Sequence, residues 1–363
     1  MDKTAYLVLE NGVSFQGEFF GKEGNITGEI VFTTGMTGYL ETLTDQSYYG
    51  QIVLQTFPLI GNYGVIPSDF ESAKVGAGAY IVKYPCHDPS NFRSEGDLDT
   101  FLLRQGIVGL CGVDTRALTR IIREHGVMNG KITTEAPAAI DLEEVRAYKI
   151  EDAVRKVSVK ERQYLRSSKP AAYTVALLDF GVKENIKREL LARNCNVWVL
   201  PCDTDSDEIT DLTPDGIVLS NGPGDPADNR EIIENIGKLV HTGIPIFGIC
   251  LGHQLLALAN DFRTHKLKYG HRGANQPVKC TENGRVYITS QNHGYAVTNE
   301  SINTQIAEEW FVNSNDGTCE GLRYKGVPAF SVQFHPEASP GPHDTAFLFD
   351  HFVESMEEHK NAT

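Results

Sequence analysis

Hydrophobic and polar positions follow different patterns in the two parts of the chain. From Tyr173 onward, short apolar runs alternate with stretches of helical periodicity. The apolar runs are TVALLDF, CNVWVLPC, GIVLS and IPIFGI, and the helical stretches are VKENIKRELLARN, REIIENIGKLVHTG and LGHQLLALAN. Apolar strands that alternate with helices indicate a parallel sheet covered on both faces. We therefore predict an α/β domain over residues 173–363, with a mostly parallel sheet flanked by helices.

Residues 1–150 have the alternating pattern of a β-rich mixed domain. AYLVLENGVSFQGEFFG alternates apolar and polar positions around Asn11-Gly12, a dipeptide typical of hairpin turns. A helix is predicted over Asp114–His125, with Asp114 as its N-cap. The charged segment 151–172, which contains Ser-Ser-Lys-Pro, is interpreted as the linker between the two domains.

Composition and charge narrow the possible functions. The 363 residues suffice for two domains, and 40% apolar and 22% charged residues are ordinary values for a globular protein. The net charge of -15, without a basic patch, argues against nucleic-acid binding. No apolar run has membrane-spanning length, and the N-terminus does not resemble a secretory signal. Since the seven cysteines form no CxxC pair, we expect neither disulfides nor a metal site, and a cytoplasmic location.

Cys250 lies where the pattern changes from strand to helix. It is the central residue of GICLG, the cysteine form of the G-x-S-x-G motif, in which a nucleophile occupies a sharp strand-to-helix turn. Small neighbours avoid clashes in such a turn, and the N–H groups at the start of the helix favour negative charge on the sulfur. A buried structural cysteine beside tight glycine turns is the alternative interpretation.

A histidine and a carboxylate follow another strand-like run. In AFSVQFHPEASPGP, His335 and Glu337 are two residues apart, so strand geometry turns both side chains to one side. His335 can accept the thiol proton while Glu337 holds its tautomer, as in a Cys–His–acid triad. A surface histidine in a proline-rich loop is the alternative, but the combination with GICLG and a parallel sheet favours catalysis.

Two further segments can complete an acyl-transfer site. The oxyanion needs N–H donors, and those of Leu251 and of Gly224 in SNGPGDP are candidates. A phosphate cradle is disfavoured there because G-x-x-x-x-G-K-[ST] is absent, and a structural turn is the other alternative. In QNHGYAV, Asn292, Gly294 and Tyr295 can hold a polar substrate, although a hairpin turn is the simpler interpretation.

Together these motifs resemble the class I glutamine amidotransferases. Within that class, the chain is most similar to the family of small, glutamine-hydrolysing subunits of carbamoyl-phosphate synthase. The motifs of the second part are LSNGPGDP, FGICLGHQLLALA, KYGHRGANQPVK, SQNHGYAV and FHPEASPGPHD. Those of the first part, TTGMTGYLETLTDQSYYGQIV, FPLIGNYG and GVDTRALTR, look particular to this family. They argue against the alternative of an amidotransferase subunit for nucleotide or anthranilate synthesis.

The resemblance implies roles for individual residues. Cys250, His335 and Glu337 form the implied triad, which hydrolyses L-glutamine through a thioester to glutamate and ammonia. The residues implied to contact glutamine or its oxyanion are Ser47 in the N-terminal domain and, in the second, Gly222, Gly224, Leu251, Gln254, Asn292, Gly294 and Tyr295. An inert scaffolding subunit is an alternative, against which the intact triad argues.

The resemblance also implies a partner. A large subunit would receive the ammonia and make carbamoyl phosphate from it, bicarbonate and two ATP, for arginine or pyrimidine synthesis. No stretch of this chain resembles an ATP site, so we expect ATP and Mg on the large subunit and no cofactor here.

Overall fold

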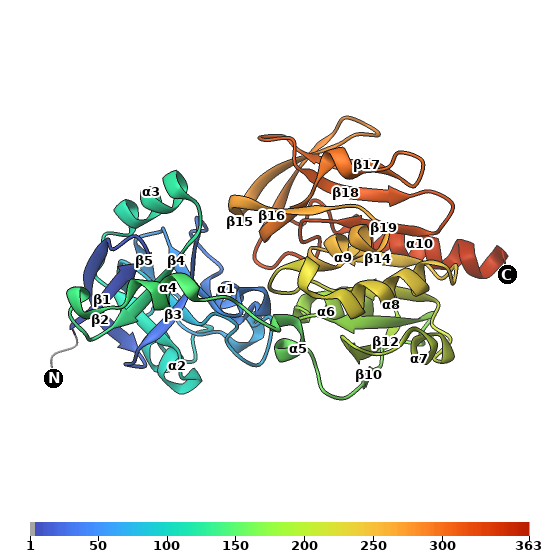
Figure 1. The fold of residues 1–363 in the computed structure, drawn as a ribbon. Coiled ribbons are helices and arrows are strands. Elements are labelled where there is room, and N and C mark those ends of the chain that lie inside the picture. Colours follow the sequence, from blue (N-terminus) through green and yellow to red (C-terminus); the bar gives the residue numbers. More distant parts are fainter. Residues whose placement is uncertain (1–3, 363) are drawn as a thin grey trace. The chain divides into compact units, whose positions relative to one another are not determined.

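The computed structural model describes residues 4–362, and the chain divides into two units, Met1–Glu151 and Asp152–Thr363. The first unit is built on a closed barrel, in which seven strands of the described residues follow the order β1-β2-β8-β6-β4-β3-β9 (Figure 1). β1 and β2 pair as the predicted antiparallel hairpin, with Ala5, Leu7 and Leu9 in the barrel core. The barrel strands are β1 (Thr4–Leu9), β2 (Ser14–Gly21), β3 (Ile26–Thr33), β4 (Gln51–Gln55), β6 (Ala79–Ile81), β8 (Val108–Cys111) and β9 (Met128–Thr133).

Helix α3 (Thr115–His125) forms in this unit as the sequence predicts. The Asp114 side chain accepts a hydrogen bond from the Ala117 N–H at 2.9 Å and caps the first turn. Leu118 and Ile122, one turn apart, are buried against the barrel core. The other elements are α1 (Tyr39–Thr44), α2 (Leu98–Gln105), α4 (Leu142–Ala147), the short β5 (Leu59–Ile60) and β7 (Tyr84–Pro85), and the 3₁₀ turns Gln46–Tyr48, Pro67–Asp69 and Pro137–Ala139.

The second unit contains a mixed sheet, which has ten strands within residues 4–362. The four predicted parallel strands are joined by a fifth, β19, in the order β12-β11-β13-β14-β19. Antiparallel strands extend both edges, so the sheet is less parallel than predicted. Residues 163–165 form one edge, and the long segment after residue 259 pairs as hairpins at the other. The strands are β10 (Gln163–Leu165), β11 (Tyr173–Asp179), β12 (Cys195–Pro201), β13 (Gly216–Leu219), β14 (Ile246–Ile249), β15 (Thr264–Cys280), β16 (Val286–Val297), β17 (Ala307–Asn313), β18 (Cys319–Tyr324) and β19 (Ala329–Val332).

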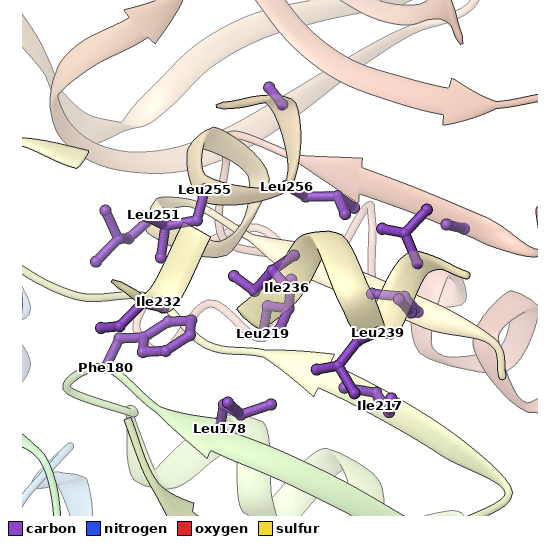
Figure 2. Packing of buried hydrophobic residues seen from close by; sticks show 14 of the residues in the cluster. Leu178, Phe180, Ile217, Leu219, Ile232, Ile236, Leu239, Leu251, Leu255 and Leu256 are labelled. Atoms are coloured by element: carbon purple, nitrogen blue, oxygen red, sulfur yellow. The ribbon is translucent and has the colours of Figure 1, made fainter. Parts of the chain in front are cut away.

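Two apolar layers cover the parallel strands. Figure 2 shows one, in which Leu178 of β11 and Leu219 of β13 pack in one cluster with side chains of α8 (Arg230–Val240) and α9 (Leu251–Ala259). The neighbouring β11 residue, Leu177, belongs to the other cluster, since successive side chains of a strand point to opposite faces. That cluster includes residues of α6 and α10. The helices are α5 (Ala153–Val157), α6 (Glu184–Ala192), α7 (Ser206–Asp211), α8 (Arg230–Val240), α9 (Leu251–Ala259) and α10 (Phe347–Ala362), with 3₁₀ turns at Pro226–Asp228 and Asn299–Ser301.

Residues 151–172, interpreted from the sequence as a linker, contain two elements of the second unit. Val154 of α5 is buried in the same apolar cluster as Leu178. β10 pairs antiparallel with β12 and forms an edge of the sheet. The sequence did not predict these elements, because the segment is rich in charged residues and only its few apolar residues pack in the core. No helix in residues 4–362 is long and apolar enough to cross a bilayer.

Candidate active site

Cys250 connects β14 to α9 in a strained backbone conformation. Its φ of 54° and ψ of -101° lie where a residue with a Cβ is rarely found. The Cys250 N–H donates to the Val332 carbonyl of β19 at 2.8 Å, which holds the turn against the neighbouring strand. The side chain is buried, with 2% of the residue exposed. The structure thus contains the sharp strand-to-helix turn that the GICLG motif predicts.

Two glycines make this turn possible. A Cβ on Gly252 would lie far inside van der Waals contact with the carbonyl oxygen of Leu219, and one on Gly248 would lie 2.9 Å from the backbone of Gly252. The close approach lets the Gly252 N–H donate to the Ser220 carbonyl at 3.0 Å. The start of α9 is therefore fixed against the end of β13.

His335 and Glu337 form a buried pair. The Nδ1 atom of His335 lies 2.7 Å from Oε1 of Glu337, and each residue is 1% exposed. With Nδ1–H donated to the carboxylate, the Nε2 lone pair of His335 remains available, and Nε2 makes no hydrogen bond to any residue that the structure describes. His335 also donates its backbone N–H to the Ser290 carbonyl of β16 at 2.9 Å.

Opposing effects set the protonation of the pair. Burial and the charge of Lys183 act to lower the pKa of His335, but Glu337 and Cys250 outweigh them and raise it above its ordinary value. Burial acts to raise the pKa of Glu337, but His335 and Lys183 outweigh it and lower that pKa. The pair therefore favours an ionised carboxylate beside a histidine that holds a proton well.

Two groups approach the Cys250 sulfur. The thiol donates to the Asn292 carbonyl of β16 at 3.7 Å, and Nε2 of Gln333 donates to the sulfur at 3.6 Å. Gln333 is fully buried and was not predicted from the sequence as a site residue. Its place two residues before His335 was an available signal, since Gln333, His335 and Glu337 alternate along the chain.

The predicted SNGPGDP turn lies beside this elbow. A Cβ on Gly222 would clash with the Phe180 carbonyl and lie 2.8 Å from the Leu251 side chain, so the turn packs on the first residue of α9. The N–H of Leu251, at the first helical position, has no acceptor within its helix. Gly224 has a φ of 89°, which glycine adopts without strain.

The QNHGYAV segment is not a turn, and that interpretation is wrong. Its residues continue strand β16, whose partner β15 contains irregularities at Lys266/His271 and Gly273/Gln276. Nε2 of Gln254 donates to the Tyr295 carbonyl at 2.7 Å and to Oε1 of Gln333 at 2.9 Å, so Gln254 links α9 to β16. Strand β16 thus places Asn292, Gly294 and Tyr295 near the start of α9.

Lys183 and Asn185 were missed from the sequence. Nζ of Lys183, a residue only 8% exposed, lies 3.5 Å from Oε1 of Glu337, and the Asn185 side chain donates to the Glu337 carbonyl. Both contact Glu337 from the loop and helix that follow β11. Ser47 belongs to the first unit, where it is 8% exposed and its N–H donates to Asp45 at 2.9 Å.

The cysteine elbow and the buried His–Glu pair beside a parallel sheet define a class I glutamine amidotransferase domain. The family model "Glutamine amidotransferase class-I" matches residues 176–355, and "Carbamoyl-phosphate synthase small chain, CPSase domain" matches residues 7–132. The chain therefore belongs to the carbamoyl phosphate synthase small chain family, as the resemblance predicted.

Full-length relatives support this assignment. The chain is 49% identical to the carbamoyl phosphate synthase small chain of Clostridium perfringens, over 96% of this chain and 98% of the relative. It is 50% identical to the carbamoyl phosphate synthase small chain of Bacillus caldolyticus, over 97% of this chain and 96% of the relative. It is 48% identical to the pyrimidine-specific small chain of Halalkalibacterium halodurans, over 98% of both. Both units are therefore shared with these relatives.

Proposed function

We propose that this chain hydrolyses L-glutamine at Cys250 and supplies the ammonia to a large chain that makes carbamoyl phosphate. The principal support is the buried pair of His335 and Glu337, which leaves Nε2 of His335 available to the thiol at the strained turn. Since the relatives are named small chains, a large chain is the expected partner.

The first half of the proposed reaction forms a thioester. His335 takes the thiol proton on Nε2, and the sulfur of Cys250 attacks the carboxamide carbon of glutamine. The oxyanion accepts hydrogen bonds from the N–H groups of Leu251 and Gly224. When the C–N bond breaks, His335 gives its proton to the departing ammonia. The raised pKa of His335 suits this step, because Glu337 stabilises the imidazolium that carries the proton.

The second half releases glutamate. His335 takes a proton from water, which attacks the thioester carbonyl, and the same N–H groups stabilise the second oxyanion. The C–S bond then breaks, and the sulfur recovers its proton. Asn292, Gly294, Tyr295, Gln254 and Gly222 are proposed to bind or orient glutamine. For Ser47 the same proposal rests on the family resemblance alone.

The remaining chemistry is assigned to the large chain. We propose that it binds ATP, Mg and bicarbonate and receives ammonia without its release to bulk water. This chain then needs no cofactor for hydrolysis, because the thiol, the histidine and the backbone N–H groups supply the nucleophile, the base and the oxyanion donors. The cytoplasmic location stays a prediction.

Replacing the nucleophile tests the proposed function. In the complex of the two chains, Cys250→Ser should lower glutamine-dependent carbamoyl phosphate synthesis by roughly 10³-fold or more, because the hydroxyl is a poor substitute for the thiol. Synthesis from added ammonium chloride should keep its rate. Cys86→Ser, a half-buried thiol in the first unit, is the matched control. Glutamate release at the wild-type rate by Cys250→Ser would contradict the assignment.

A further inference from the structure

Strands β15, β16 and β18 bring three potential metal ligands together outside the proposed catalytic triad. His271 and His293 are direct partners in the β15–β16 register, and their rings lie 4.9 Å apart. Glu320 of β18 completes the group, in which one ligand atom of each residue lies within 4.8 Å of the others. We propose that His271, His293 and Glu320 bind a divalent transition-metal ion, with zinc as the best match to two imidazoles and a carboxylate.

Hydrogen bonds orient both imidazoles toward this point. Nε2 of His271 lies 2.8 Å from Oδ2 of Asp316, so it donates its proton there and leaves the Nδ1 lone pair toward Glu320. Nδ1 of His293 lies 2.8 Å from the Tyr295 carbonyl oxygen, so it donates its proton there and leaves a lone pair on Nε2. Metal-bound histidines in proteins have such oxygen partners on their second nitrogen, which fix the tautomer.

The group contains more acceptors than donors. Nε2 of His293 faces Oε1 of Gln291 at 3.1 Å, although Nδ1 already needs the single proton of the neutral ring. The Gln291 amide is oriented by Nε2, which donates to Oγ1 of Thr289 at 3.2 Å. A second proton on His293 would place a charge on an imidazole that is 5% exposed. A cation among these lone pairs removes the conflict.

The buried carboxylate of Glu320 has one oxygen without a hydrogen-bond partner among the described residues. The residue is fully buried, and this oxygen is Oε2. Oε1 accepts from Nδ2 of Asn313 at 2.9 Å and lies 3.4 Å from Nδ1 of His271. Tetrahedral ligands at zinc distances are about 3.3 Å apart, so this edge of the site already has the required length. A buried carboxylate oxygen without a partner is costly, and a metal ion would compensate it.

The site was not expected from the sequence. Its ligands come from three strands, so they form no local spacing pattern of the kind that reveals zinc motifs. A bound ion would join β15, β16 and β18 next to the strand positions of Asn292 and Tyr295. Its expected role is structural, and the inference does not depend on the proposed glutaminase activity.

Zinc binding to the full-length chain tests the inference. Metal-depleted protein in a Cys250→Ser background, which removes the proposed nucleophilic thiol, should bind one Zn²⁺ in calorimetric titration. Co²⁺ should give the visible absorption bands of a tetrahedral site. Glu320→Gln and His271→Ala should abolish binding, and Asp316→Asn should weaken it by roughly 10–100-fold, as loss of an orienting partner does.

A control variant and a stability measurement make the result decisive. His265→Ala removes another β15 histidine, whose Nδ1 lies 3.0 Å from Oγ1 of Thr298, and should bind zinc normally. Zinc should raise the thermal midpoint of the Cys250→Ser protein and of the His265 variant, but not that of Glu320→Gln. Absence of zinc binding at about 100 micromolar free metal, or equal binding by Glu320→Gln, would overturn the inference. A proton shared by His271, Asp316 and Glu320 would then account for the cluster.

Discussion

At the scale of single residues, Cys250 shows how the structure supports a strained conformation. A residue with a Cβ in a sparsely populated region costs about 1–3 kcal/mol and persists only when its surroundings determine it. Here the Cys250 N–H is held by Val332, and the Gly252 N–H two residues later is held by Ser220. The strain is thus maintained by two neighbouring strands, which aim the side chain at β16. A structural cysteine would need none of this.

His253, next to the elbow, predicts a pH dependence of stability. It is fully buried, its Nδ1 lies 2.8 Å from Oγ of Ser331, and burial lowers its pKa to about 3. The unfolded chain has the ordinary value of about 6.5 and binds the proton first. The contribution of His253 to stability is therefore intact above pH 6.5 and falls by about 1.4 kcal/mol for each pH unit below it.

Urea unfolding at pH values from about 7.5 to 5 measures this effect as a slope. His253→Gln should make the free energy of unfolding less dependent on pH than in the wild type, whatever its absolute stability. His241→Gln, at an exposed position, should leave the slope unchanged. Equal slopes in the wild type and in His253→Gln would show that His253 is not held neutral by folding.

At the scale of elements, the contact between α9 and β13 should be sensitive to a single methyl group. Gly252→Ala places a Cβ against the Leu219 carbonyl and forces α9 away from the strand. We expect a loss of about 1–3 kcal/mol in the free energy of unfolding. The displaced helix start should also lower the glutaminase kcat by roughly 10²-fold, as small misplacements of catalytic groups do.

A second helical glycine serves as the control for this contact. Gly237 lies in α8, where the nearest atom to an added Cβ is 3.9 Å away. Gly237→Ala should therefore leave kcat unchanged and stabilise the chain by about 0.5–1 kcal/mol. Thermal unfolding measures the stability of both variants, and a coupled glutamate assay measures their kcat. Wild-type kcat and stability in Gly252→Ala would mean that the elbow tolerates displacement.

The sequence predicted the elements whose apolar residues follow one clear pattern, either a continuous run or a helical stripe. β11 to β14 are nearly continuous apolar runs, and α8 has a buried stripe of Ile232, Ile236 and Leu239. The QNHGYAV part of β16 was mistaken for a turn, because its glycine and buried polar residues, such as Gln291 and His293, break the apolar alternation. Their side chains contact other polar groups of the same strand, Thr289 and Tyr295, so the strand is held by polar contacts that an apolar pattern does not contain.

The candidate site divides in the same way. Local motifs identified Cys250 and the pair of His335 and Glu337, because a sharp turn and a two-residue spacing are visible along the chain. Lys183, which follows β11, contacts Glu337, which follows β19. The two residues are more than a hundred positions apart in sequence. Such partners are brought together only by the topology of the sheet, so no spacing could reveal them.

At the scale of the whole molecule, each unit has a separate hydrophobic core. The clusters around Leu7 and Tyr80 contain residues of the first unit alone, and those around Leu178 and Phe247 contain residues of the second alone. The division falls before α5, so the segment expected to be a linker contributes to the second core. The second unit should therefore fold by itself when it keeps that segment.

Two fragments test where the second unit begins. Residues 152–363 should unfold cooperatively, whereas residues 173–363 lose Val154, which is 2% exposed, and the β10 strand that covers β12. Removal of one buried valine alone costs about 1.5–3 kcal/mol. Since 1 kcal/mol shifts the midpoint of a unit of this size by about 2–4 °C, the shorter fragment should melt at least about 3 °C lower, or should not fold. Circular dichroism melting curves measure the difference. Equal midpoints would mean that α5 and β10 add nothing to the core, and that residues 151–172 act as a linker after all.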